Sequence, residues 1–253
     1  MDTEIQICIV IPCYNEEKRF LSEEFSSFIK DNPDVLLCFV NDGSSDHTFG
    51  ILNYLMIEYP NQIDVISYSK NKGKAEAVRQ GILYCNSKYN HIFIAFLDSD
   101  LSITLQECAD MRSYLNKNIC FCFGSRIMRI GAIIERKFYR FFLGRIIATF
   151  ISNILDLKVY DTQCGCKLFT KEISDQLFKV KFESKWLFDV EIFFRMILIF
   201  GKKEVLTRML EVPVLKWIDK DNSKIKPTYF FRLWFDLFKI NYTYKKQILQ
   251  ILN

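Results

Sequence analysis

The stretch IFIAFLDSD, residues 92–100, decides the fold and shows where to look for chemistry. Its first six residues are apolar and rich in isoleucine and phenylalanine, which is typical of a buried strand. Two carboxylates, Asp98 and Asp100, follow the run directly. Because alternate residues at a strand end point the same way, both can converge on one hard cation. The stretch therefore predicts a strand that ends at a divalent metal site, for Mg²⁺ or Mn²⁺.

Alternating strand and helix patterns surround this stretch. The expected strands are Ile5–Ile11, Val35–Val40, Ile63–Ser67 and Ile92–Leu97, and helical patterns begin near Glu16, Asp46 and Lys74. This order predicts an α/β protein with a Rossmann-like, mostly parallel sheet that carries helices on both faces. In such sheets the ligand site lies at the carboxyl ends of the strands.

The composition is that of a globular chain. Half of the 253 residues are hydrophobic, which is ample for a buried core. The longest stretches without a charged residue have eleven residues, well short of the ~20 needed to span a bilayer, and the N-terminus lacks the features of a signal peptide. We therefore expect a cytoplasmic chain with one continuous domain over residues 1–226 and a helical extension over residues 227–253.

Several classes of site lack the residues they need. The chain has only two histidines, His47 and His91, and its nine cysteines include no C-x-x-C pair. These counts argue against a Ser-His-Asp site, a histidine-rich metal site and a zinc or redox site. No G-x-G-x-x-G follows the first strand and no P-loop motif occurs, which argues against a dinucleotide dehydrogenase and a P-loop NTPase. Any chemistry must rest on carboxylates, lysines and arginines.

Positive charge is concentrated in two segments. The net charge is +4, but residues 125–150 carry six Lys or Arg against one Glu, and residues 224–253 carry six against one Asp. Such blocks indicate an anionic partner, which can be a phosphate, a lipid headgroup or a nucleic acid. No RRM, KH or zinc-finger signature is present, so we expect no nucleic acid partner.

Residues 129–155 show the pattern of an interfacial helix at about 100° per residue. One stripe holds Arg129, Arg136 and Arg140, and the opposite face holds Ile134, Phe138, Phe141 and Phe142. A surface helix that packs its aromatic face into the core would have the same spacing. Arg145 projects near the apolar side, where it would snorkel or meet a phosphate. Because residues 229–251 repeat this mixture, we expect an anionic membrane surface as a partner.

Seven motifs in order resemble one protein family. They are IPCYNEEKRF, VNDGSSDHT, NKGKAEAVRQGI, FLDSDLS, GSRI, DTQCGCKLF and FDVEIFFR, with a terminal S-K pair at Ser223 and Lys224. The series resembles the family 2 glycosyltransferases with the GT-A fold. Within them it is similar to the polyprenyl-phosphate hexosyltransferases, more to the dolichyl-phosphate glucosyl type than to the mannosyl type. The resemblance implies an inverting transfer of a hexose, with glucose expected, from a nucleotide sugar to a lipid phosphate.

The resemblance also implies roles for individual residues and a place in the cell. Pro12, Tyr14, Glu16, Asp42, Lys74 and Asp98 would bind the nucleotide sugar, with Asp100 and Asp98 at the metal. Arg126, Asp161, Asp189 and Glu191 would form the catalytic group, and Arg126, Arg145, Ser223 and Lys224 would bind the acceptor or its phosphate. The enzyme would act peripherally at the cytoplasmic face of a membrane, either the endoplasmic reticulum or a bacterial inner membrane.

The acceptor determines whether a general base is needed. A phosphate monoester has a second pKa of about 6, so its attacking oxygen is already largely anionic at neutral pH. We therefore interpret Asp161 as a residue that orients the sugar or the acceptor. Transfer to a sugar hydroxyl is the first alternative, with Asp161, Asp189 or Glu191 as the base. A non-catalytic module that binds membranes or nucleic acid is the second. The sequence leaves open UDP-glucose against GDP-mannose as donor, and also the oligomeric state.

Overall fold

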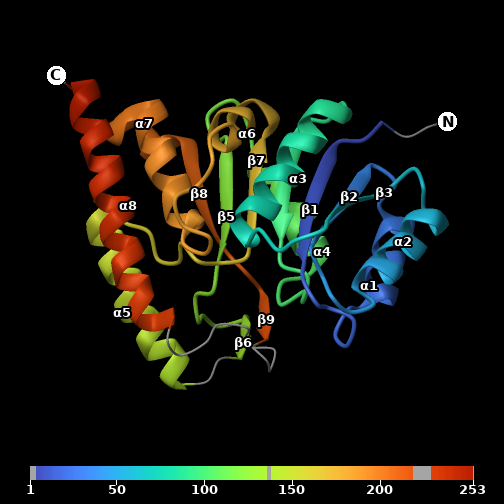
Figure 1. Ribbon diagram of the computed structural model, residues 1–253. Coiled ribbons are helices and arrows are strands. Elements are labelled where there is room, and N and C mark those ends of the chain that lie inside the picture. The colour runs from blue at the N-terminus through green and yellow to red at the C-terminus, as the bar shows by residue number, and fades with distance from the viewer. Residues whose placement is uncertain (1–3, 136–137, 219–228, 253) are drawn as a thin grey trace.

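The computed structural model describes residues 4–135, 138–218 and 229–252 and shows a central sheet with helices on both faces (Figure 1). The strands are β1 Ile7–Cys13, β2 Val35–Asp42, β3 Ile63–Tyr68, β4 Phe93–Leu97, β5 Phe121–Ser125, β6 Ile133–Glu135, β7 Cys166–Thr170, β8 Met209–Pro213 and β9 Lys216–Ile218. The helices are α1 Ser22–Asp31, α2 Thr48–Glu58, α3 Lys74–Lys88, α4 Leu105–Asp110, α5 Phe138–Leu155, α6 Lys171–Phe178, α7 Phe188–Arg208 and α8 Tyr229–Leu252, with a short 3₁₀ helix at Met111–Tyr114.

The main sheet has seven strands in the order β3-β2-β1-β4-β7-β5-β8. Strand β7 runs antiparallel to both of its neighbours, β4 and β5, whereas the other neighbouring pairs are parallel. All strands except β7 therefore end at the same edge of the sheet. This topology confirms the predicted mostly parallel α/β fold, and the four predicted strands correspond to β1 to β4.

Residues 129–155 do not form the single helix that the wheel predicted. Ile133–Glu135 is strand β6, which pairs with β9 in a separate parallel ribbon, and helix α5 begins only at Phe138. Gly131 has a φ of 85°, which interrupts any helix before β6. The predicted stripe of Arg129, Arg136 and Arg140 is therefore wrong as a helical face, and the side chains of Arg136 and Arg140 lie outside the described residues.

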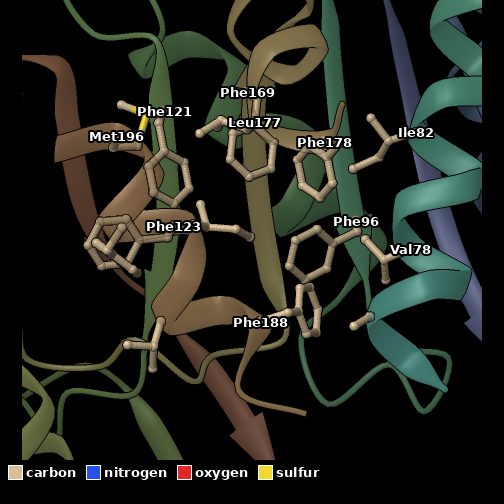
Figure 2. Close-up of a cluster of buried hydrophobic side chains, with 14 of the residues drawn as sticks. Val78, Ile82, Phe96, Phe121, Phe123, Phe169, Leu177, Phe178, Phe188 and Met196 are labelled. Carbon is tan, nitrogen blue, oxygen red and sulfur yellow. The ribbon is translucent and has the colours of Figure 1, made fainter. Parts of the chain in front are cut away.

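Two hydrophobic cores form because successive strand residues face opposite sides of the sheet. On β1, Cys8 and Val10 join the core under α3, α6 and α7, whereas Ile7, Ile9 and Ile11 join the core under α1, α2 and α4. The first core is built around phenylalanines from strands and helices (Figure 2). Phe121 and Phe169 stack with their ring centroids 4.6 Å apart. This packing fixes the strands whose ends form the site.

Helix α8 belongs to the same core. Leu237, Ile240 and Tyr244 are buried, and the Tyr244 ring stacks on Phe194 of α7 with centroids 5.2 Å apart. The α8 residue Trp234 contacts Phe150 of α5 edge to face at 4.9 Å. The predicted C-terminal helix is therefore present and packed against the domain. The predicted boundary between residues 226 and 227 falls outside the described residues.

Among the helices that the structure describes, none combines the length and the apolar character needed to cross a bilayer.

Candidate active site

The loops after β1 and β2 are joined by hydrogen bonds from backbone amides to side-chain oxygens. The Asn15 amide donates to Ser44 Oγ at 3.0 Å, and the Ser45 amide donates to Asn15 Oδ1 at 2.8 Å. One residue further, the Glu16 amide donates to Thr48 Oγ1 at 2.8 Å. These bonds position the Y-N-E-E segment beside the N-D-G-S-S segment. Tyr14 is about one-third exposed at the end of β1, and Pro12 is partly buried within the strand.

Asp42, at the end of β2, organises the turn before α3. Its two carboxylate oxygens accept hydrogen bonds from the Lys72 and Gly73 amides, both at 2.8 Å. The side chain is buried, and burial raises the pKa of Asp42 although the two N–H donors act to lower it. A contact of Asp42 with the base or ribose stays a prediction.

The two carboxylates after β4 lie beside Lys74, at the start of α3. Lys74 Nζ is 2.5 Å from Asp98 Oδ1, and Asp100 Oδ1 accepts from the Ser102 amide at 3.0 Å. Burial lowers the pKa of Lys74, but Asp98, followed by Asp189, more than offsets this effect and the pKa is raised. The end of β4 is thus followed by two carboxylates, and the charged ammonium group of Lys74 pairs with that of Asp98.

Gly165, in the D-T-Q-C-G segment, forms the wall behind Asp98. The Asp98 amide donates to the Gly165 carbonyl at 3.0 Å. A Cβ atom at position 165 would lie 2.1 Å from Asp98 Oδ2, which no real structure allows. Only glycine lets this loop approach the carboxylate so closely.

Asp161 and Arg126 form a buried ion pair. Arg126 Nε and Nη2 lie 2.6 and 2.8 Å from the two oxygens of Asp161, and the Arg126 amide also donates to Oδ2 at 3.2 Å. Burial alone would raise the pKa of Asp161, but the guanidinium lowers it to about 2. Arg126 was expected to meet phosphate, and Asp161 is the partner that the structure gives it.

The loop that carries Asp161 is held from two sides. Glu211 of β8 accepts from the Tyr160 amide at 2.9 Å and from the Asp161 amide at 2.8 Å. Arg145 of α5 donates to the Tyr160 carbonyl at 2.7 Å, and its guanidinium lies 3.5 Å from the centroid of the Tyr160 ring. Arg145 thus positions this loop, and its binding of an acceptor phosphate stays a prediction.

Asp189 and Glu191, two residues apart at the start of α7, point in different directions. Asp189 faces the site and lies 2.6 Å from Nζ of the fully buried Lys167. Glu191 accepts from the Ser184 amide at 2.8 Å and from the Tyr244 hydroxyl at 2.9 Å. Burial raises the pKa of both carboxyls. Glu191 therefore joins α7 to α8, and its predicted place beside a sugar or acceptor pocket stays a prediction.

Four residues of this region were missed by sequence reasoning. Arg19 binds Glu16 through two nitrogens, and the distance from Nη2 to Oε1 is 2.8 Å. Hydrogen bonding to Glu16 raises the pKa of Arg19, and Asp100 and Asp98 add to the effect. The others are Lys167, Glu211 and Trp217, whose ring lies 5.4 Å from the Arg126 guanidinium carbon. Only Arg19 had a usable signal, because it lies beside the acidic E-E pair. Ser223 and Lys224 lie outside the described residues.

A cavity of about 310 Å³ lies between α1, the segment from Leu101 to Gln106 and β9. Leu101 and Ser102 form one wall, α1 forms another, and Lys216 and Ile218 of β9 form a third. Its lining mixes apolar side chains with hydroxyl and charged groups. Neither Asp98 nor Asp100 belongs to this lining.

The mostly parallel sheet with carboxylates at a strand end is that of a GT-A glycosyltransferase fold, and comparison with known proteins identifies the family. The model for "Glycosyl transferase family 2" matches residues 8–178, so the chain belongs to the family 2 glycosyltransferases. It is a glycosyltransferase, which removes the alternative of a non-catalytic module. Its resemblance to the family, inferred from the seven motifs, is confirmed.

The similar proteins include several dolichyl-phosphate beta-glucosyltransferases. That of Saccharomyces cerevisiae is 31% identical over 253 residues, which cover 88% of this chain and 70% of the relative. That of Dictyostelium discoideum is 27% identical over 247 residues, 88% of this chain and 69% of the relative. A solved structure of glucosyl-3-phosphoglycerate synthase from Mycobacterium tuberculosis, in complex with Mn²⁺, UDP and phosphoglyceric acid, matches with a TM-score of 0.60 at 14% identity, over 97% of this chain and 78% of that chain. This likeness shows the fold.

Proposed function

We propose that the chain transfers glucose from UDP-glucose to dolichyl phosphate, with inversion at the anomeric carbon. The observation that carries this proposal is the strand-end cluster of Asp98, Asp100 and Lys74 beside the buried Arg126–Asp161 pair. Relatives of up to 31% identity are named dolichyl-phosphate beta-glucosyltransferases, which supports the sugar and the acceptor. The glucosyl activity named for these relatives supports glucose over mannose, and the UDP in the complex of the structurally similar synthase agrees with UDP-glucose as the donor.

Asp98 and Asp100 fit a Mg²⁺ or Mn²⁺ ion bound together with the donor. Among the described residues, no group of three or more His, Cys, Asp or Glu side chains could hold a metal. Magnesium-like ions are commonly held by one or two carboxylates plus substrate phosphates, so this pair suffices. When bound, the cation neutralises the diphosphate leaving group. Lys74 lies beside Asp98, so its ammonium group would be available to the same phosphates.

Asp161 serves in this proposal to hold Arg126 and not as a base. A carboxyl whose pKa lies at about 2 is a poor proton acceptor at neutral pH. A phosphate acceptor needs no base, since its oxygen is already anionic, but it needs a positioned cation. Arg126 is such a cation, because its ion pair with Asp161 holds it largely buried. This arrangement favours a phosphate acceptor over a sugar hydroxyl.

We further propose that the β6–β9 ribbon and the start of α5 rest on an anionic membrane surface. Met128, Ile130, Ile133 and Leu215 are all more than half exposed there, and Phe142 and Ile146 of α5 extend the apolar surface. The ribbon follows β5 and β8, so it lies at the edge where the parallel strands end, as Figure 1 shows. Exposed Arg129 and Lys216 add positive charge. A lipid phosphate at this surface would lie near the site.

A direct assay tests the reaction. Purified chain, Mn²⁺ and labelled UDP-glucose are incubated with vesicles that contain dolichyl phosphate, and the lipid product is separated and counted. We expect the label to appear in dolichyl-phosphate glucose. A parallel reaction with labelled GDP-mannose should transfer little label to the lipid. Label that enters a free glycan but not the lipid would instead support the sugar-hydroxyl alternative.

A further inference from the structure

A chain of alternating charges crosses the interior of the site, from Asp98 through Lys74 and Asp189 to Lys167. The two ends of this chain are close ion pairs, with Lys74 at 2.5 Å from Asp98 and Lys167 at 2.6 Å from Asp189. Asp98 directly follows β4, and Lys74 begins α3. Asp189 lies in the first turn of α7, and Lys167 is the second residue of β7. Each lies on a different element, so the fold itself assembles the chain.

A cation bound by Asp98 conflicts with the Lys74 pair. The ammonium lies on Asp98 Oδ1, and a divalent ion on this carboxylate would be repelled by it. The other oxygen, Oδ2, faces the backbone of Gly165 so closely that a Cβ atom would not fit. Gly165 therefore blocks rotation of Asp98 toward that side. A divalent cation that takes Oδ1 would displace Lys74 from it.

Asp189 is the carboxylate that can receive this ammonium. It is 5% exposed in the first turn of α7, and the Ala75 amide, next to Lys74, donates to the Lys185 carbonyl just before that helix at 3.2 Å. The place of Asp189 is fixed by the ion pair with Lys167, which is fully buried and donates a hydrogen bond to the Cys164 carbonyl at 2.7 Å. We propose that Asp189 is a positioning residue that holds Lys74 when a divalent cation takes Asp98, so that the ammonium stays directed at the donor diphosphate. This inference rests on the proposed cation site at Asp98 and Asp100.

Binding of Mn²⁺ alone tests the inference without turnover. Free Mn²⁺ is measured by electron paramagnetic resonance during titration of the parent chain, Asp189→Asn, Lys74→Met and the double variant. In Asp189→Asn, Lys74 has no second partner and stays on Asp98, so we expect Mn²⁺ affinity to fall about fivefold. In Lys74→Met the competing charge is gone, so the affinity should rise. In the Lys74→Met background, the Asp189→Asn change should have little further effect.

Two further variants keep the result interpretable. Asp64 forms a similar pair with Lys88 at 2.7 Å at the other end of α3, so Asp64→Asn should leave Mn²⁺ affinity unchanged. If Asp189→Asn does not fold, Lys167→Met/Asp189→Leu removes both buried charges together, which proteins tolerate better, and should show the same loss. Equal losses from Asp189→Asn with and without Lys74 would overturn the inference alone. Failure of the parent chain to bind Mn²⁺, with or without UDP, would overturn the cation site and the inference with it.

Discussion

The carboxylate of Asp161 and the guanidinium of Arg126 are joined by two parallel bonds of 2.8 and 2.6 Å in a buried setting. Such bidentate pairs are strong and geometrically specific. Because the pair connects the end of β5 to the D-T-Q-C-G loop, the position of each charge depends on the other. Asp161 thus determines where the Arg126 guanidinium lies, and this is the cation that we propose meets the acceptor phosphate.

Asp161→Asn is expected to lower turnover on the order of 100-fold, since Arg126 would lose its fixed position. The pH dependence of the remaining activity should keep the parent's shape. The reason is that the pKa of Asp161, at about 2, lies below the range of the assay. Rates with dolichyl phosphate measured from about pH 5 to 9 test this. If a rising limb of the parent disappeared in the variant, Asp161 would be a general base.

The same pair predicts acid sensitivity. Folding depresses the pKa of Asp161 from 3.8 to about 2, so its contribution to stability, about 2 kcal/mol, is present above pH 4 and is lost as the pH falls toward 2. Asp161→Asn should therefore lower the unfolding midpoint in denaturant most at neutral pH, with the difference from the parent shrinking below pH 4. A difference that is constant from pH 7 to pH 2 would contradict this assignment.

Asp100→Ala should abolish transfer while the chain stays folded. The proposed cation would lose one of its two protein carboxylates, and the diphosphate would lose part of its counter-charge. The fold should tolerate the change, because Asp100 is partly exposed and accepts only one backbone bond that the structure describes, from Ser102. Turnover with Mg²⁺ or Mn²⁺ and a thermal melt measure the two effects. Turnover close to that of the parent would refute the cation site.

Gly165→Ala is predicted to disable the same site from the neighbouring loop. The added methyl group would lie 2.1 Å from Asp98 Oδ2 and must push the carboxylate or the loop away. We expect weaker Mn²⁺ binding and a loss of activity on the order of 100-fold. Gly131→Ala is the control, because a Cβ atom there meets no atom within 4 Å, although its positive φ adds some strain. Equal activity of the two variants would contradict the close approach.

Local patterns explain what the sequence could predict. Strands β1 to β4 are short apolar runs that end in polar turns, and the D-S-D motif marks its own strand end. Strand β7 and ribbon β6–β9 depend on pairing with residues far along the chain, such as Leu97 with Cys166 and Ile133 with Lys216. A helical wheel cannot detect such pairing, so residues 129–135 were assigned to the wrong element.

The pairing of the buried charged residues could not be predicted from the sequence for a similar reason. Lys167 lies in an apolar run, and nothing near it in sequence indicates that Asp189 of α7 neutralises it. Glu191 belongs to the F-D-V-E motif, yet one of its hydrogen bonds comes from the hydroxyl of Tyr244 of α8, 53 residues away. Only the packing of α7 against both the site and α8 separates these two carboxylates. Motifs identify which residues gather but not which way each side chain points.

Membrane attachment should depend on the β6–β9 ribbon. Ile130 and Ile133 have relative exposures of 104% and 57%, so the pair Ile130→Glu and Ile133→Glu should not disturb the core. Burying an isoleucine contributes roughly 1.5–3 kcal/mol, so binding to anionic vesicles should fall about tenfold or more in co-sedimentation. Binding of the parent should also weaken with salt, because Arg129 and Lys216 act at the surface of the vesicle.

The controls for this prediction separate attachment from folding. Ile57→Glu changes an isoleucine of α2 that is 69% exposed and outside the ribbon, and it should leave vesicle binding unchanged. Removal of residues after Lys226 would be a poor test, because Leu237, Ile240 and Tyr244 of α8 are buried and their loss would expose the core. UDP affinity should stay the same in both isoleucine variants. Unchanged vesicle binding in the ribbon variant would exclude this surface, and equal binding to neutral and anionic vesicles would exclude its electrostatic part.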